Sequence, residues 1–559
     1  MLLQVPRARV DGLTRAFGVS PPDAHGFPPA GFTTPAVLLN DFVMAMLSSI
    51  RQPLLLTGSL LCTLLLLALP AQAQTADEVV RLSQRTPGVG AANLGMGGVG
   101  IAGMGDASAF ITNPAGLGWL GRSEVSGSMT GTIAETDAVF GPSGDLTAET
   151  GTQYTIGNAA YLYDSPTQRG TFVIGAALNQ THTFQRSTRF SGINNQSTIT
   201  TSFLPFDSEF EVDGDDIRFF ADLPDLAFGA GAIEFFDDLF EDGAFPFLQA
   251  AIPGTTLEQS GSVVEEGATR EFNIGGAWEA APQLMVGLSG NVSFANYRFE
   301  NRFVEFDIDG ENTREDFNVL LDDGSLLEGF NAVTFDRVLD TRLVGFNARA
   351  GVSAQVNPLL RLGATIESPT FYSVEDDFRQ ALQVDFEVGG SLSDELTSTF
   401  DYEIQTPWRF GAGAGLEFGN VTAHADVEVV DWSQTSVSAS GNQAFIDELN
   451  RQLRDDFSAV VNTRAGLELR LLPFTVRGGA AFLPDPAGND GRDRTFLSAG
   501  VGYEVPGQFA VDFGWMQERF DDQLLPYPED ELGPRQDDVI QVDESIIRNR
   551  LKLGLRIFL

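Results

Sequence analysis

"LKLGLRIFL" (residues 551–559) alternates between two kinds of side chain. In an extended strand the odd-numbered residues, all Leu or Ile, lie on one face, and Lys552, Gly554 and Arg556 lie on the other. The segment therefore predicts a strand with one apolar face.

The same alternation recurs along the rest of the chain. In "NVTAHADVEVVDW" (420–432) one face carries Val and Ala, while the other carries His424, Asp426 and Glu428. The pattern predicts about fourteen strands, at 121–131, 151–163, 170–185, 266–280, 282–306, 333–356, 359–375, 396–417, 419–437, 457–472, 474–484, 493–505, 508–521 and 544–559.

The connections between these segments are of two kinds. Short turns, such as Asn357–Pro358, Gly419–Asn420 and Pro506–Gly507, alternate with long acidic loops. Outer-membrane barrels sort their loops in this way, and closing the sheet leaves no unpaired edge in the bilayer. We therefore expect an all-β, transmembrane antiparallel β-barrel (121–559) in a Gram-negative outer membrane. Membrane lipid and the barrel assembly machinery are its expected partners.

The N-terminal region carries an export signal. "MLSSIRQPLLLTGSLLCTLLLLALPAQAQ" (46–74) has one Arg, an apolar run and a small-residue cleavage site at Ala71–Ala73. This predicts a signal peptide at 46–73, preceded by an extension (1–45) that carries no function. A membrane anchor at 54–69 is the alternative.

Charge restricts the partners. The chain has 34 Lys and Arg against 76 Asp and Glu, a net charge of −42. Nucleic acid is therefore excluded as a partner. Lys552 is the only lysine, a composition typical of halophiles. Acidic loops would repel a fatty-acid carboxylate, so either strong salt screens them or the substrate is neutral.

A glycine-rich stretch lies between the signal peptide and the first strand. "TPGVGAANLGMGGVGIAGMGDASAFITNPAGLGW" (86–119) is rich in Gly and Ala, which pack main chain closely, and Asn113–Pro114 favours a turn. We expect residues 74–120 to form a plug in the lumen.

Within this stretch, "GMGDASAFITNPAGL" (103–117) resembles the N-terminal hatch of the FadL family of outer-membrane transporters for long-chain fatty acids and hydrocarbons. "LRLGATIESP" (360–369), the segment 406–434 and "LELRLLPFTVRGGAAFLPDP" (467–486) are similar to strands of that family. The resemblance implies a hatch at Gly103, Gly105, Asn113, Pro114 and Ala115.

The same resemblance implies a transport route. Hydrophobic small molecules, fatty acids or hydrocarbons, would be captured at the outer loops, pass a hatch-gated barrel and leave sideways into the membrane. PorV-like barrels of protein secretion share the "GMGG…NPAGL" opening, so a secretion component is the alternative.

The longest predicted loop (186–265) is rich in Phe. Ile233, Phe236, Leu239 and Phe240 recur at helical spacing, which predicts a short helix. That helix either caps the rim or belongs to a hydrophobic capture surface. The candidate substrate-binding residues are Phe219, Phe220, Phe228, Phe235, Phe236, Phe240 and Arg218. Arg186 or Arg189 could also form an ion pair with the carboxylate of a fatty acid.

Catalysis has little support in the sequence. The predicted mature chain holds two histidines, His182 and His424, and His424 with Asp426 is interpreted as a polar pair facing the lumen. Acidic clusters at 215–216, 307–312 and 322–323 are interpreted as solvated loops, with Ca²⁺ binding as the alternative. We expect no enzyme activity, cofactor or metal.

Overall fold

The computed structural model describes residues 75–559 except 142–143, 145, 214–215, 242–243, 313–316, 322, 442 and 528–539. The predicted extension (1–45) and signal peptide (46–73) lie outside the described residues, as do Asp215 and Asp322 of the acidic clusters. In the part of the chain that is described, no helix has the length and apolarity needed to cross a membrane.

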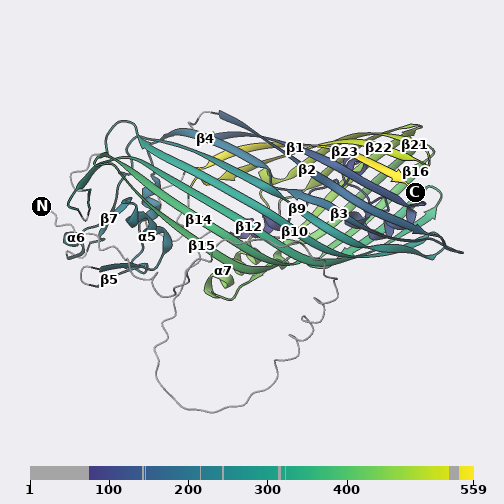
Figure 1. Ribbon diagram of the computed structural model, residues 1–559, viewed down its shortest axis with the longest axis horizontal. Coiled ribbons are helices and arrows are strands. Elements are labelled where there is room, and N and C mark those ends of the chain that lie inside the picture. Colours follow the sequence, from purple (N-terminus) through teal and green to yellow (C-terminus); the bar gives the residue numbers. More distant parts are fainter. Residues whose placement is uncertain are drawn as a thin grey trace, which may run out of the picture. The chain divides into compact units, whose positions relative to one another are not determined.

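Antiparallel strands make up the wall of the molecule (Figure 1). They are β1 (Glu124–Phe140), β2 (Leu146–Ser165), β3 (Phe172–Thr183), β4 (Arg186–Asn194), β9 (Leu257–Ala281), β10 (Leu284–Asp307), β12 (Leu326–Asn357), β13 (Leu360–Glu367), β14 (Phe371–Val388), β15 (Ser391–Gln405), β16 (Arg409–Phe418), β17 (Val421–Asp431), β19 (Ala459–Leu471), β20 (Phe474–Leu483), β21 (Arg494–Val505), β22 (Phe509–Leu524) and β23 (Val542–Phe558). Two short strands, β11 (Asn318–Leu320) and β18 (Ser436–Ser438), pair at its margin.

The wall closes into a barrel of fourteen positions, as predicted. Three positions hold two consecutive strands each: β3 with β4, β13 with β14, and β15 with β16. Pro369 and Pro407 lie at two of these breaks, where proline removes a main-chain donor. β1 pairs with β2 on one side and with β23 on the other, which closes the ring.

The outward face of the wall carries an apolar band. On β10, Leu288 and Val292 are exposed. Beyond Asn296, toward the loop end of the strand, the same face becomes charged, with Arg298 and Glu300. The alternation of an apolar exterior with a polar interior is the pattern of transmembrane barrels. β10 and β12 continue beyond this band, so the wall extends past the membrane on the loop side.

The predicted plug lies against the inner face of the wall. It contains α2 (Ala76–Ser83), α3 (Ala91–Gly95), α4 (Ala109–Thr112) and the 3₁₀ turn η1 (Pro114–Trp119). α3 contacts β20 to β23, and η1 contacts β3, β9, β10 and β12. α2 begins with a capping box in which Thr75 and Glu78 each accept from the other's main-chain N–H.

The described residues of the segment 195–256 form a lid at the loop end of the long strands (Figure 1). It contains η2 (Ile199–Phe203), β5 (Phe210–Asp213), β6 (Asp216–Phe219), α5 (Asp222–Gly229), β7 (Ile233–Phe235), α6 (Asp237–Glu241) and β8 (Phe247–Gln249). Three further elements lie in other loops: η3 (Trp432–Gln434), α7 (Gln443–Asp455) and η4 (Asp490–Arg492).

Two predictions for this region were wrong. The loop does not run from 186 to 265, because β4 occupies 186–194 and β9 begins at Leu257. The helix expected across 233–240 is instead strand β7 followed by the short helix α6, because Ile233–Phe235 pairs with Phe247–Gln249 of β8. The apolar residues still pack onto the rim, where Phe236 shares a buried cluster with Phe303 and Phe335.

Candidate functional site

The plug meets the wall at glycines. Six inward-facing wall positions, which we call the glycine belt, lie so close to the plug that a Cβ atom at any of them would overlap plug atoms: Gly287, Gly351, Gly363, Gly466, Gly479 and Gly514. These glycines belong to β10, β12, β13, β19, β20 and β22. Glycine lets two main chains approach directly, so the belt forms a seat around the lumen.

Asn113 fastens η1 to this seat. Its Nδ2 donates to the carbonyl oxygens of Ile101 at 2.7 Å and Val352 at 3.0 Å, and its Oδ1 accepts from the N–H of Ala115 at 3.0 Å. The side chain is completely buried. Pro114 takes the first position of η1, where its missing N–H costs no hydrogen bond.

Gly103 and Gly105, the other predicted hatch residues, pack against Trp119. Gly103 has φ +114°, a conformation that favours glycine. Trp119 Nε1 donates to Ser353 Oγ at 2.8 Å, and the Arg361 guanidinium lies 4.3 Å from the Trp119 ring. The structure thus gathers the predicted hatch residues against the wall, and their role as hinges stays a prediction.

Buried charges also tie the plug to the wall. Arg85 of the plug binds Glu367 at 2.7 Å and Glu271 at 3.2 Å, and Arg349 of the wall binds the same two carboxylates at 2.8 and 3.3 Å. The four groups have no net charge. On another side, Asp426 accepts from the main-chain N–H groups of Gly100 at 2.6 Å and Ile101 at 3.0 Å, so the polar face predicted around His424 does line the lumen.

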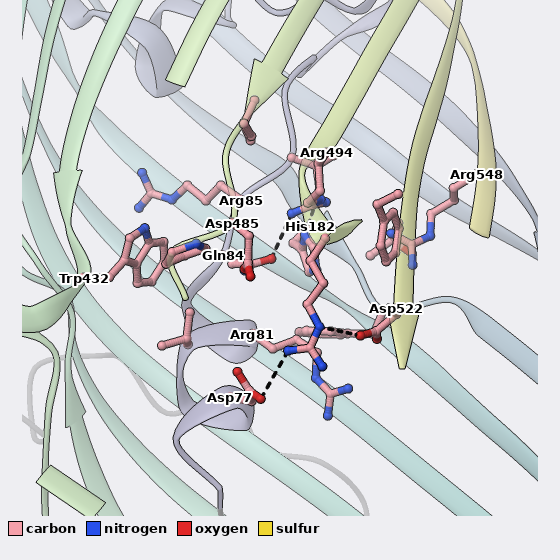
Figure 2. Close-up of a pocket in the computed structure, with 18 of the residues that line it drawn as sticks. Asp77, Arg81, Gln84, Arg85, His182, Trp432, Asp485, Arg494, Asp522 and Arg548 are labelled. Atoms are coloured by element: carbon pink, nitrogen blue, oxygen red, sulfur yellow. Dashed lines mark hydrogen bonds and ion pairs between the residues drawn. The ribbon is translucent and has the colours of Figure 1, made fainter. Parts of the chain in front are cut away.

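A cavity of about 550 Å³ lies between α2 and the wall (Figure 2). This is within the size range of small-molecule sites. Figure 2 places Arg81 and Arg85 of the plug and Arg494 and Arg548 of the wall around the same space. The lining also includes aromatic side chains: Phe184, Phe299, Phe378, Trp432, Phe457 and Phe520.

The cavity is rich in arginine. Nine arginines and six carboxylates line it, although acidic residues outnumber basic ones more than twofold in the whole chain. Burial in this cavity raises the pKa of Glu78 to about 7, because the desolvation of the carboxylate outweighs the attraction of Arg81. Near neutral pH, Glu78 therefore carries only part of a negative charge.

The predicted capture residues lie in the lid and not in this cavity. Phe219, Phe228 and Phe235 pack with Phe247 into one aromatic cluster, in which Phe219 and Phe247 are 5.6 Å apart and Phe235 and Phe247 are 5.4 Å apart. Phe236, also in the lid, is buried. Of the seven residues, Phe220, Phe240 and Arg218 are exposed.

Of the two other arginines considered from sequence, one reaches the cavity. Arg186 lines it and binds Glu265 at 3.4 Å and Asp522 at 3.2 Å, whereas Arg189 is exposed and binds Glu149 at 3.2 Å. Sequence reasoning missed Arg81, Arg85 and Arg337. A signal for Arg337 was present, because it interrupts an apolar face of β12 between Phe335 and Leu339.

A closed fourteen-position barrel with an apolar exterior, an internal plug and a cavity between the plug and the wall defines a plugged transmembrane barrel. No protein-family model and no curated protein matches the sequence. Among solved structures, it is similar to the toluene transporter TodX of Pseudomonas putida, with a TM-score of 0.48 and 13% identity over 84% of this chain and 99% of that one.

Two further structures have a similar fold. For the toluene transporter TbuX of Ralstonia pickettii, the TM-score is 0.45 and the identity 16%, over 84% of this chain and 99% of that one. For a FadL homologue of Pseudomonas aeruginosa, the TM-score is 0.46 and the identity 11%, over 85% of this chain and 99% of that one. At such values a likeness assigns no substrate.

Proposed function

We propose that this protein takes up hydrophobic small molecules across an outer membrane. A molecule captured at the lid enters the arginine-rich cavity and leaves sideways into the bilayer, while the plug keeps the lower lumen shut. The observation that carries the proposal is the position of the cavity, which lies between helix α2 of the plug and the wall, beside a seam where two strands of the wall share no ladder.

The seam lies between β2 and the interrupted strand β3/β4. β2 pairs with β3 only from Asn158 to Ser165, and among the described residues its outer half shares no ladder with β4. Tyr154 and Ile156 are exposed on the outside of this half, so the seam lies within the apolar band. Unpaired main chain at this depth is tolerated where it borders a cavity.

Side chains bridge the seam in place of a ladder. Thr183 Oγ1 donates to Gln153 Oε1 at 2.9 Å, and Thr155 Oγ1 donates to Gln180 Oε1 at 2.6 Å. Thr183 and Phe184 also line the cavity. Further along the seam, Thr147 Oγ1 donates to the carbonyl oxygen of Arg189, and Arg189 binds Glu149 at 3.2 Å. Separating these side-chain contacts, of which the ion pair is exposed, costs less than separating a strand ladder, which makes the seam a suitable exit.

The plug contacts the wall at this exit. β3 has a register shift between Gln180 and His182, and the carbonyl of the intervening Thr181 accepts from the N–H of Thr86 at 2.9 Å. Thr86 Oγ1 also lies 2.7 Å from His182 Nδ1. A shift of the plug would release both contacts, so plug movement and seam opening would be coupled.

A crosslink across the seam tests the proposal. The pair Gln153→Cys with Thr183→Cys, joined by oxidation or by a short bis-maleimide, should stop uptake of labelled hexadecane and palmitate by cells, and reduction of the oxidised pair should restore it. The control pair is Ser126→Cys with Ala160→Cys, which face each other in the intact β1–β2 ladder and should leave uptake unchanged.

Undiminished uptake with the seam crosslinked would contradict lateral release. If the wild-type protein supports no uptake of either probe and instead co-purifies with secretion components, the PorV-like alternative is favoured.

A further inference from the structure

The lid is joined to the wall by a buried carboxyl group. Glu305 faces inward from the part of β10 beyond the apolar band and is fully buried. The N–H of Ile199 in the lid donates to its Oε2 at 3.1 Å, and Thr198 Oγ1, also in the lid, forms a hydrogen bond with its Oε1. On the wall side, Gln259 Nε2 of β9 donates to the same Oε2 at 2.6 Å. One side chain thus connects the start of η2 to two strands of the wall.

No charged side chain in the described part of the chain acts on Glu305. Only its burial and its three hydrogen bonds affect its ionisation. The inward positions level with it on the neighbouring strands hold Gly192 of β4, Gln259 of β9 and Val333 of β12. A negative charge at Glu305 would therefore be buried without a cation, which is unfavourable.

The titratable groups beside Glu305 are Asp307 and Tyr527. Asp307 follows on the inward face of β10, and its carboxylate accepts from the main-chain N–H of Gly310 at 3.1 Å, in the loop after that strand. The hydroxyl of Tyr527 lies 3.1 Å from Ser197 Oγ of the lid. Neither group supplies a positive charge.

The hydrogen bonds around Glu305 suit its protonated form. A carboxylic acid at this position can donate its proton to Thr198 Oγ1, whose hydroxyl can then donate to Thr200 Oγ1, 3.0 Å away. Thr200 Oγ1 in turn donates to the carbonyl oxygen of Ala251 at 3.4 Å, so each hydroxyl hydrogen has an acceptor within the lid. Burial outweighs these hydrogen bonds and raises the pKa of Glu305 from 4.5 to about 7.

We infer that Glu305 is a latch, which holds the lid on the wall while its carboxyl group is protonated and releases the lid when that group ionises. An open lid would let the carboxylate meet water. Because the pKa is raised in the closed lid, the contribution of the latch is fully present below pH 4.5 and is lost as the pH rises through about 7. Release would uncover Phe303 and Phe335 of the wall, which share a buried cluster with Phe203 and Phe236 of the lid.

The position of the lid tests the latch. Spin labels at Phe220→Cys in the lid and Glu300→Cys on the outer face of β10, both exposed positions, report their separation in lipid nanodiscs by pulsed electron resonance. With a pKa of 4.5 in the open lid and about 7 in the closed lid, the ratio of open to closed lids should rise about fortyfold from pH 5 to pH 7. No substrate is added, so the result is independent of the proposed uptake.

Two variants and a matched control assign the effect to this carboxyl group. Glu305→Gln mimics the protonated form, so its lid should stay closed from pH 5 to pH 8. Thr198→Val removes the hydroxyl of the lid, so its open fraction should already be raised at pH 5. Asp376→Asn is the control, because Asp376 is also buried and inward-facing, on β14, but accepts from Thr341 Oγ1 of the wall at 2.5 Å. Its lid should respond to pH as in the wild type.

A label separation that stays constant from pH 5 to pH 8 in the otherwise unchanged protein would overturn the latch. A pH response of the same size in Glu305→Gln would overturn it as well, since another group would then control the lid. The heat-dependent shift on a denaturing gel should be the same in every variant, which shows that the wall is folded and that the labels report the lid.

Discussion

The seat of the plug can be tested by two substitutions made on opposite sides of one contact. Asn113→Ala removes the side chain that joins η1 to the wall. Gly351→Ala instead adds a methyl group on β12, where the new Cβ would overlap Asn113 Oδ1. We expect both changes to unseat the plug while the barrel itself stays folded.

The size of the effect follows from the contacts of Asn113. Its Nδ2 makes two hydrogen bonds to the wall, to the carbonyl oxygens of Val352 at 3.0 Å and Ala364 at 3.4 Å, in a fully buried position. At about 1 kcal/mol for each bond, the loss of plug–wall interaction is about 2 kcal/mol. Since 1.4 kcal/mol is a factor of ten, the unseated population should rise by roughly thirtyfold.

Two measurements separate the plug from the barrel. Conductance in planar bilayers reports openings of the lumen, and the heat-dependent shift on a denaturing gel reports the folded wall. Asn291→Ala is the control, because Asn291 is equally buried but bonds only to wall residues, Asn347 at 2.7 Å and Asn273 at 2.8 Å. An opening frequency in Asn113→Ala and Gly351→Ala no higher than in Asn291→Ala would refute the assigned role of the glycine belt.

Two further predictions concern the charges of the plug. Because burial raises the pKa of Glu78 from 4.5 to about 7, the seated plug is favoured below pH 4.5, and this contribution is lost as the pH rises to about 7. Opening frequency should therefore increase by about tenfold from pH 6 to pH 8 in the wild type and stay flat in Glu78→Gln, and a flat wild-type profile would contradict the assignment. Arg85→Met leaves Glu271 and Glu367 to share Arg349, at a cost of about 3–5 kcal/mol. It should unseat the plug in the conductance assay, and adding Glu367→Gln should reseat it, whereas an unseated double variant would show that charge balance is not the cause.

The wall could be predicted from the sequence because a strand of a transmembrane barrel is recognised locally. One face meets lipid and the other meets the lumen, so a period of two extends along each strand, as in 551–559. The plug was also recognisable, since its glycines and Asn113–Pro114 are contiguous. The belt glycines are visible too, but their function depends on what lies opposite each of them.

Neither the lid nor the cavity could be predicted from the sequence, and the reasons differ. Residues 233–240 suit a helix by spacing, but pairing with Phe247 of β8 decides in favour of a strand. The cavity combines Glu78 with Arg337 and Trp432, which lie hundreds of positions after Glu78 in the chain. Which carboxylate each of the nine arginines of the cavity contacts depends on the folded structure, and no local sequence pattern indicates it.

Neighbouring strands of this wall are hydrogen-bonded to different extents, and this divides assembly of the barrel and passage through it between two different strand pairs. The junction of β1 with β23 is hydrogen-bonded over the whole of β1, whereas the junction of β2 with β3 ends at Asn158. The continuous ladder between β1 and β23 can thus hold the barrel closed once it has assembled. The proposed exit lies two strands away, where the outer half of β2 shares no ladder with its neighbour among the described residues.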